Sequence, residues 1–217
     1  MIKAKHNIFA ESIYRIYVKW LLKFNFNKFI LINEIPDVTN CKGLIVTPNH
    51  FSWWDGFFIE YLMRKFTKRK LFIMMLEKQL KRFWFFKYLG AFSIRQKSIF
   101  SLSETIKYAR TILTSSFSYL VFYPQGEIQN YEKKFIKLKR GLIAVTSDIE
   151  CSVLIVSFKI IYRADKKPDV YCRFGEEPIL NLSKDDFVCY ERLFLKNIEQ
   201  LDEEISNKNG IDLLTEK

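Results

Sequence analysis

Short, largely apolar runs recur along most of the chain, each bounded by turn residues or charges. A run of about five to ten such residues has the length of a strand buried on both faces, and Val, Ile and Phe favour that assignment. Strands are therefore predicted at residues 29–33, 43–47, 71–76, 91–95, 118–123, 152–161 and 169–174.

Between these runs, apolar residues recur at intervals of three and four, which is the period of a helix packed on one side. The helix that includes residues 101–115 is expected to start at the Ser-x-Ser-Glu sequence around Ser101 and Ser103. Strands that alternate with helices indicate an α/β fold, with a mostly parallel or mixed sheet and helices on both faces. Helices are predicted at residues 7–24, in the segment after residue 52, and at 78–88, 101–115, 138–148 and 184–206.

The first helix has two distinct sides. Three cations, Arg15, Lys19 and Lys23, follow one another at steps of four residues, and apolar residues recur at helical spacing beside them. This pattern predicts a helix in a membrane interface, and the alternative is an ordinary amphipathic helix packed on its own domain. We therefore predict a membrane-surface helix at residues 1–28 and one domain at residues 29–217. The apolar residues are Ile13, Ile16, Tyr17, Trp20, Leu21 and Phe24.

Composition narrows the choice of partner. The 217 residues carry a formal net charge of +11, and 17% of them are aromatic. A basic chain binds an anionic partner such as nucleic acid, anionic lipid or a phosphorylated small molecule. Because aromatic and basic residues are interleaved, as at a membrane interface, we expect a lipid surface as the partner and no nucleic acid.

No stretch of about 18 uncharged apolar residues is present, so no membrane-spanning helix is predicted. The apolar segment after the basic start MIKAKHN is interrupted by Glu11, Arg15 and Lys19, which argues against a signal peptide. We expect a peripheral or monotopic protein at the cytoplasmic face of a membrane. The four cysteines are far apart and include no CxxC pair, so no metal site is expected.

The strongest candidate for chemistry is the sequence NHFSWWD at residues 49–55. On a continuous helix, His50 and Asp55 would lie about 140° apart and could not meet. They can meet where His50 precedes a helix and Asp55 lies in its first turn. Ser52 as the N-cap, with Asp55 three residues later, favours this arrangement. Asp55 would then fix the tautomer of His50 and leave the other ring nitrogen as a base.

His50 has a structural alternative, a histidine satisfied within a loop, and Asp55 equally suits a plain capping role. The only other histidine, His6, lies in a terminus that is expected to fray. His50 instead follows the predicted buried strand at 43–47, at the kind of strand end where α/β proteins build their sites. This position favours a catalytic role for His50.

The NHFSWWD sequence resembles the HX4D block of the glycerolipid acyltransferases, the family of lysophosphatidate and glycerol-phosphate acyltransferases. Asn49, His50, Ser52 and Asp55 match its pattern N-H-x-S-x-x-D. Further blocks follow in the family's order, and the resemblance extends from about residue 30 to residue 175. The blocks are GAFSIR at 90–95, which resembles a glycine-to-arginine block, YPQGEI at 123–128, which resembles F-P-E-G-T-R, LKRG at 138–141, which resembles F-K-K-G, and an apolar strand at 153–158.

The resemblance implies direct transfer of an acyl group from a coenzyme A or acyl carrier protein thioester to a hydroxyl of a lysolipid-like acceptor, without a metal or other cofactor. His50 is then the general base, Asp55 orients it, and Ser52 is a cap rather than a nucleophile. Arg95 is expected to hold a phosphate of the donor or acceptor, with a surface ion pair as the alternative. Substrate-binding roles are expected for Asn49, Arg95, Gln125, Gly126, Glu127 and Lys139.

Two departures from the family pattern bear on the acceptor. Gln125 stands where the family has Glu, and Ile128 stands where it has Arg, with the anion of Glu127 nearby. A phosphate is less suited to this position, so another lysolipid, an amino-acid lipid or a sugar on a lipid or pigment competes with lysophosphatidate as the acceptor. The alternative to an enzyme is a catalytically silent membrane-binding module. A nucleic-acid-binding protein is disfavoured, since no known binding motif is present.

Overall fold

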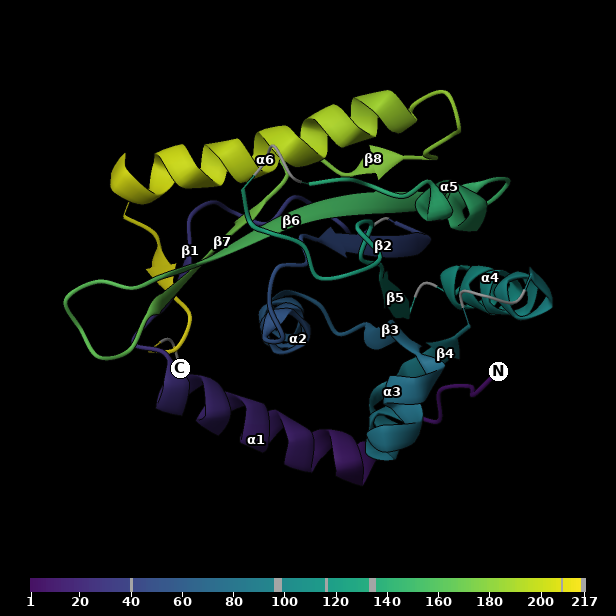
Figure 1. The fold of residues 1–217 in the computed structure, drawn as a ribbon, viewed down its shortest axis with the longest axis horizontal. Coiled ribbons are helices and arrows are strands. Elements are labelled where there is room, and N and C mark those ends of the chain that lie inside the picture. The colour runs from purple at the N-terminus through teal and green to yellow at the C-terminus, as the bar shows by residue number, and fades with distance from the viewer. Residues whose placement is uncertain (40, 96–98, 116, 133–135, 208, 216–217) are drawn as a thin grey trace.

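The computed structural model describes residues 1–39, 41–95, 99–115, 117–132, 136–207 and 209–215. Its strands are β1 (Phe29–Leu31), β2 (Gly43–Pro48), β3 (Lys70–Leu76), β4 (Ala91–Ile94), β5 (Ser118–Val121), β6 (Cys151–Ile161), β7 (Asp169–Phe174), β8 (Ile179–Leu180) and β9 (Ile211–Asp212). Within these residues they form one sheet in the order β4-β3-β5-β2-β6-β7-β1-β9, and β8 pairs with β6 beside this path. The sheet runs through the middle of the molecule, with helices on either side of it (Figure 1).

Parallel pairing dominates the half of the sheet that begins at β4. Each neighbouring pair from β4 through β6 is parallel, and β1 is parallel to β7, whereas β6–β7, β1–β9 and β6–β8 are antiparallel. The predicted α/β fold with a mixed sheet is confirmed. The helices are α1 (Ile8–Asn25), α2 (Asp55–Phe66), α3 (Glu77–Arg82), the 3-10 helix η1 (Trp84–Leu89), α4 (Ile99–Leu113), α5 (Gly141–Thr146) and α6 (Phe187–Asn207).

Strand β2 contributes to two separate cores, because successive side chains of a strand point to opposite faces of the sheet. Leu44 and Val46 pack in the core that α1 and α2 cover. Ile45 packs in the core that α4, α5 and α6 cover. Burial on both faces explains why the sequence of β2 is an uninterrupted apolar run.

Some local elements differ from the predictions. α4 begins at Ile99 rather than near Ser101, and the Ser101 carbonyl accepts a hydrogen bond from the Thr105 hydroxyl inside the helix. The helix predicted at 78–88 is divided into α3 and η1, and η1 ends at Leu89, before Gly90 with its φ of 98°. The strands β8 and β9 were not predicted, because two residues are too few to show an alternating pattern.

The first seven residues are held against the domain, so the prediction that His6 lies in a frayed terminus is wrong. The Ser93 N–H of β4 donates to the Ile2 carbonyl at 2.9 Å, and the Ile2 N–H donates to the Ser93 hydroxyl at 2.7 Å. The His6 ring meets Phe72 edge-on, and its Nδ1 lies 2.6 Å from a carboxylate oxygen of Glu11. These contacts give His6 a structural role.

Helix α1 packs on α2 and η1, and it buries Val18 and Leu22 fully. Its outward side, together with part of η1, leaves large apolar residues 43% to 81% exposed, and we name these residues the outer face. No helix among the described residues is long and apolar enough to cross a membrane. The outer face consists of Ile8, Phe9, Ile13, Ile16, Trp20 and Phe24 of α1 with Trp84 and Phe85 of η1.

Candidate active site

Neighbouring parallel strands bring polar residues to one edge of the sheet. β2 ends at Pro48 and is followed by Asn49 and His50. Its parallel neighbour β5 ends at Val121 and leads to Tyr123 and Gln125. Because the carboxyl ends of parallel strands lie on the same side of the sheet, these two segments meet there.

His50 and Asp55 make the contact that their spacing predicts. Nδ1 of His50 lies 2.8 Å from Oδ2 of Asp55. The imidazole also stacks on the ring of Tyr123, with 4.1 Å between the centroids. The His50 side chain is 23% exposed, whereas the Asp55 side chain is fully buried. With Nδ1 engaged by the carboxylate, Nε2 is the ring nitrogen left for a substrate.

The Asp55 carboxylate is fixed by three donors on one oxygen. Oδ2 accepts the backbone N–H groups of Phe51 at 2.8 Å and Ser52 at 2.9 Å, in addition to His50. Burial raises the pKa of Asp55 above its usual value, and the hydrogen bonds from His50 and the two N–H groups act in the opposite direction. Oδ1 is buried without a hydrogen-bond partner among the described residues.

The start of α2 differs from the prediction at Ser52. The helix begins at Asp55 with Trp54 as its N-cap residue, so Ser52 is not the cap. The Ser52 hydroxyl instead accepts the Trp54 N–H at 3.1 Å, in a turn that precedes the helix. The acidic half of the predicted capping box forms, because the Asp55 carboxylate reaches back to the Ser52 N–H, and the serine half does not.

The side-chain amides of Asn49 and Gln125 are buried and bonded to backbone groups. Nδ2 of Asn49 donates to the Phe158 carbonyl at 2.9 Å, and Oδ1 accepts the Phe158 N–H at 2.7 Å. Oε1 of Gln125 accepts the His50 N–H at 2.5 Å, and Nε2 donates to the His50 carbonyl at 3.3 Å. Both residues therefore hold the backbone at the site, and their contact with a substrate stays a prediction.

Gly126, Glu127 and Lys139 lie together in the exposed loop region after β5. Gly126 has a φ of 71°, a conformation that favours glycine. A β-carbon at this position would come within 3.0 Å of Cδ of Lys139. Nζ of Lys139 lies 3.2 Å from a carboxylate oxygen of Glu127. The structure thus gathers three of the predicted substrate-binding residues next to Gln125, and their contact with a ligand stays a prediction.

Arg95 follows β4 and is engaged by Glu77, the first residue of α3. Its Nε and Nη2 donate to the two carboxylate oxygens at 2.5 and 2.7 Å. The hydrogen bond from Arg95, and then that from Lys81, lower the pKa of Glu77 to about 2. Two strands separate β4 from β2, so their ends lie roughly 14 Å apart at the usual strand spacing. Arg95 is therefore not among the residues gathered around His50, and phosphate binding there stays a prediction.

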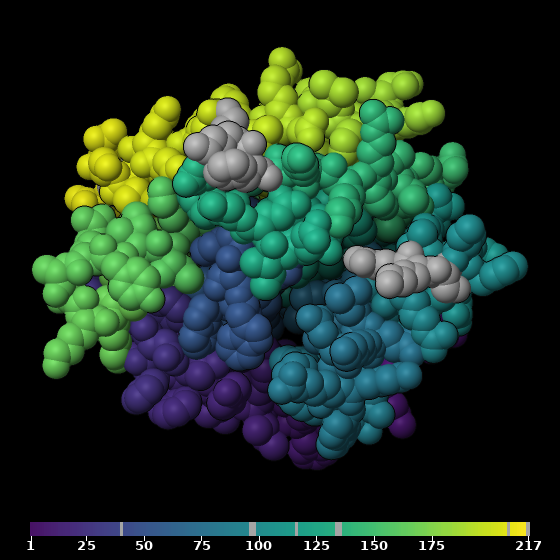
Figure 2. All heavy atoms as spheres, viewed as in Figure 1, coloured from purple at the N-terminus to yellow at the C-terminus, as the bar shows by residue number. Residues whose placement is uncertain are grey.

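An apolar cavity of about 420 Å³ opens beside His50. Residues from α1, α2, β3 and η1 line it, and the face drawn in Figure 2 is hollowed near its centre. Among the described residues, the polar side chains that line it, besides those of tyrosine and tryptophan, are His50 and Gln79. Much of the remaining lining is aromatic: Tyr14, Tyr17, Trp53, Phe57, Phe83, Phe85, Phe86 and Tyr123.

Several members of the site were not predicted. Tyr123 lies within the YPQGEI block, and Gly56, which lines the cavity, directly follows Asp55. Closeness to a motif was the available signal for both. The sequence held no comparable signal for Tyr14 and Tyr17 of α1 as cavity residues, because the packing of α1 on the domain brings them there.

Comparison with known proteins found no matching curated protein and no matching solved structure. A sequence model of the family described as Acyltransferase matches residues 30–160. The match covers more than half of the chain and includes His50, Asp55 and the loop after β5. The chain therefore belongs to the acyltransferase family that its glycerolipid acyltransferase motifs predicted.

Proposed function

We propose that this protein transfers a fatty acyl group from an acyl thioester to a hydroxyl of a lysolipid-like acceptor. His50 acts as the general base, and Asp55 orients it. The observation that carries the proposal is the 2.8 Å contact between the two side chains beside an apolar cavity, in a chain of an acyltransferase family. The cavity has the size and lining of a small-molecule site and suits an acyl chain.

In the proposed reaction, Nε2 of His50 takes the hydroxyl proton as the acceptor oxygen attacks the thioester carbonyl. A C–O bond forms and the C–S bond breaks. The leaving thiolate takes the proton back from His50 and departs as a free thiol. Asp55 keeps Nδ1 protonated and stabilises the imidazolium that exists between the two proton transfers. The donor, acyl-CoA or acyl carrier protein, is a co-substrate, and no further cofactor takes part in the proposal.

The outer face supports a membrane as the partner. Trp20 and Phe24 stack there with 5.4 Å between their centroids and are both exposed. Arg15, Lys19 and Lys23 are exposed on the same helix. Exposed aromatic residues next to cations suit an anionic bilayer, in which each cation adds about 1 kcal/mol of attraction. We propose a peripheral or monotopic protein at the cytoplasmic face of a membrane.

Two observations bear on the acceptor. Ile128 lines the cavity at the position where the family motif carries arginine. Lys139, a cation of the same loop region, is paired with Glu127. Both favour an acceptor without a free phosphate here, such as another lysolipid, an amino-acid lipid or a sugar on a lipid or pigment. A strong preference for lysophosphatidate over neutral acceptors contradicts this part of the proposal.

The test incubates the purified protein with labelled acyl-CoA and acyl carrier protein thioesters and a panel of acceptors on lipid vesicles, and identifies products by mass. His50→Ala should lower kcat about 10²–10⁴-fold, while sedimentation with phosphatidylglycerol vesicles stays unchanged. His6→Ala is the matched control, since it removes the other histidine, which Glu11 engages.

The outcomes distinguish a His50-dependent acyltransferase, a catalytically silent membrane-binding module and an enzyme that does not bind membranes. Wild-type activity in His50→Ala excludes His50 as the base. A wild-type protein that binds vesicles and acylates no acceptor is the silent membrane-binding module. Absence of vesicle binding by an active wild-type enzyme removes the membrane from the proposal and leaves the chemistry.

A further inference from the structure

We propose that Gln125 is a positioning residue for His50: its amide holds both backbone polar groups of His50 and so fixes the imidazole against Asp55. This inference rests on the proposed function. It gives Gln125 a role in placing the base rather than in contacting a substrate.

The contacts of Gln125 are directed at a single residue. Its side chain is buried, at 1% exposure, and does not line the cavity. Oε1 accepts the His50 N–H at 2.5 Å, and Nε2 donates to the His50 carbonyl at 3.3 Å. The N–H belongs to the peptide before the His50 Cα and the carbonyl to the peptide after it. Because both peptide planes are held, the direction of the His50 side chain is held as well.

Gln129 fixes which way the amide of Gln125 points. Its backbone N–H donates to the His50 carbonyl at 2.9 Å, and its Oε1 accepts from Nε2 of Gln125 at 3.3 Å. Its Oε1 also accepts the Lys137 N–H at 2.9 Å, and its Nε2 donates to the Lys137 carbonyl at 3.1 Å. Nε2 of Gln125 therefore faces two oxygens, whereas Oε1 faces an N–H. A flipped amide would place acceptor against acceptor.

Gln125 and Asp55 hold consecutive parts of one segment. Gln125 bonds the backbone of His50, and the Asp55 carboxylate bonds the N–H groups of Phe51 and Ser52. The ring contact between His50 and Asp55 therefore depends on a backbone that is held at each of three successive residues. A change at Gln125 removes the acceptor of the His50 N–H and leaves the His50 carbonyl with the Gln129 N–H.

The family motif carries Glu at this position, but in this chain the position needs a group that both accepts and donates, because the His50 carbonyl and Oε1 of Gln129 both face Nε2 of Gln125. A carboxylate here accepts the His50 N–H, but it has no proton for the His50 carbonyl or for Oε1 of Gln129. Buried oxygens would then face one another without a hydrogen, which is unfavourable. A carboxyl that takes up a proton regains a donor. The effect of Gln125→Glu on His50 should therefore weaken at low pH, where the new carboxyl is protonated.

The experiment compares Gln125→Glu and Gln125→Met with the wild type. Gln200→Glu is the matched control, because Gln200 lies on α6 and bonds Glu176. Both Gln125 variants should lower kcat about 10²-fold at neutral pH, with KM for donor and acceptor unchanged. The kcat ratio of Gln125→Glu to the wild type should rise as the pH falls, since the new carboxyl becomes protonated, whereas the ratio for Gln125→Met stays flat.

A second measurement does not depend on activity. The chain has two histidines, so NMR of the imidazole groups reports His50 with His6 as an internal reference. In both Gln125 variants the His50 ring signals should shift and those of His6 should not. Unmoved His50 signals, unchanged kcat, or a loss confined to KM for the acceptor overturns the proposal. If the wild type transfers no acyl group, the proposed function fails, and the NMR spectra alone decide whether Gln125 positions His50.

Discussion

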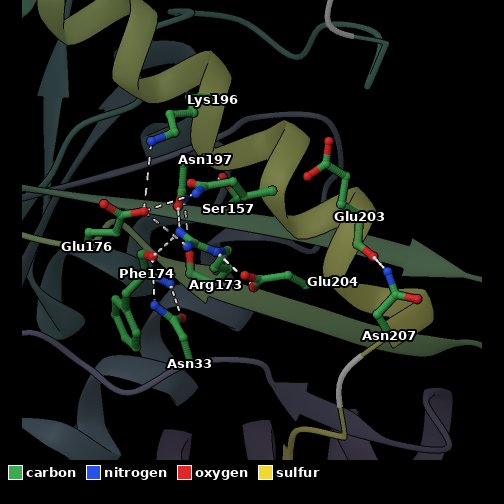
Figure 3. A network of polar contacts seen from close by, with 11 residues as sticks. Asn33, Ser157, Arg173, Phe174, Glu176, Lys196, Asn197, Glu203, Glu204 and Asn207 are labelled. Atoms are coloured by element: carbon green, nitrogen blue, oxygen red, sulfur yellow. Dashed lines mark hydrogen bonds and ion pairs between the residues drawn. The ribbon is translucent and has the colours of Figure 1, made fainter.

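Two buried charges in this molecule have opposite surroundings. Arg173 of β7 is 4% exposed, and each nitrogen of its guanidinium has an oxygen neighbour. Figure 3 shows the network that joins it to α6. Asp55, in contrast, receives three donors on one oxygen and none from the described residues on the other. The oxygens around Arg173 are those of Glu204 at 3.0 Å, Asn197 at 2.5 Å, the Phe174 carbonyl at 2.9 Å and Glu176 at 3.8 Å.

Under the proposed function, the difference separates a charge that stabilises the fold from a charge that orients the catalytic base. Nδ2 of Asn197 also donates to the Ser157 hydroxyl at 2.8 Å. The network therefore connects α6 with β6 and β7. Both Oδ1 of Asp55 and the hydroxyl of Tyr123, whose ring stacks on His50 and lines the cavity, are buried without partners among the described residues. Unsatisfied buried polar atoms cost stability. Their position next to His50 accords with the proposed catalytic role of this region.

The largest effect is expected where the site itself is broken. Asp55→Asn should lower kcat about 10³–10⁴-fold, because a neutral amide no longer stabilises the charged form of His50. The thermal midpoint should change little, since the new amide oxygen still accepts the N–H groups of Phe51 and Ser52. Steady-state rates and thermal unfolding measure the two results, and a variant within tenfold of the wild type shows that Asp55 does not assist His50.

The opposite result is expected at Arg173. Arg173→Met should lower the free energy of unfolding by about 3–5 kcal/mol, because it removes the buried guanidinium that Glu204 and Asn197 contact. The kcat of the folded protein should stay at the wild-type value. Urea denaturation measures the stability, and Arg163→Met is the control, since Arg163 is half exposed in its pair with Asp169. A loss of kcat without a loss of stability would reverse the comparison.

A third change fills the space beside the site. An ideal β-carbon at Gly56 meets no atom within 4 Å, although this glycine lies in α2 and lines the cavity. Gly56→Leu should lower kcat/KM for the longest accepted acyl donor about 10–200-fold and spare shorter ones. Gly56→Ala is the control and should raise the free energy of unfolding by up to about 1 kcal/mol. An equal loss for every chain length places the acyl chain outside the cavity.

The smallest effect is expected at the ion pair between Glu77 and Arg95. The folded-state pKa of Glu77, about 2, lies below the usual 4.5. Its contribution to stability is therefore complete above about pH 4.5 and is lost as the pH falls toward 2. The difference in thermal midpoint between the wild type and Glu77→Gln should shrink over this range. A difference that is constant with pH contradicts the ion pair as its source.

Much of the fold could be predicted, because its cause is local. The strand β2 and the contact between His50 and Asp55 both follow from residues within a few positions of one another. The pairing of Arg95 with Glu77 could not be predicted, since it depends on β3 and β4 being parallel neighbours. The same limit applies to Gln125, because the meeting of the β2 and β5 ends decides that its amide faces the backbone of His50 and not a ligand.

Local patterns also failed where two arrangements satisfy the same groups. Ser52 has the chemistry of an N-cap, yet its hydroxyl bonds a turn and the helix starts three residues later. The serines near the start of α4 lie inside the helix, where a carbonyl of one of them accepts a threonine hydroxyl. Sequence alone assigns such residues to a helix start, and packing decides on which side of the start they lie.

Helix α1 separates the cavity from the outer face. Tyr14 and Tyr17 line the cavity beside His50, while the side chains of Ile13 and Ile16 are exposed on the outer face. A movement of α1 would therefore change the volume of the cavity and the position of the outer face together. A partner that binds the outer face and moves α1 would change the affinity of the cavity for its ligand. By thermodynamic linkage, the ligand would change the affinity for that partner by the same factor.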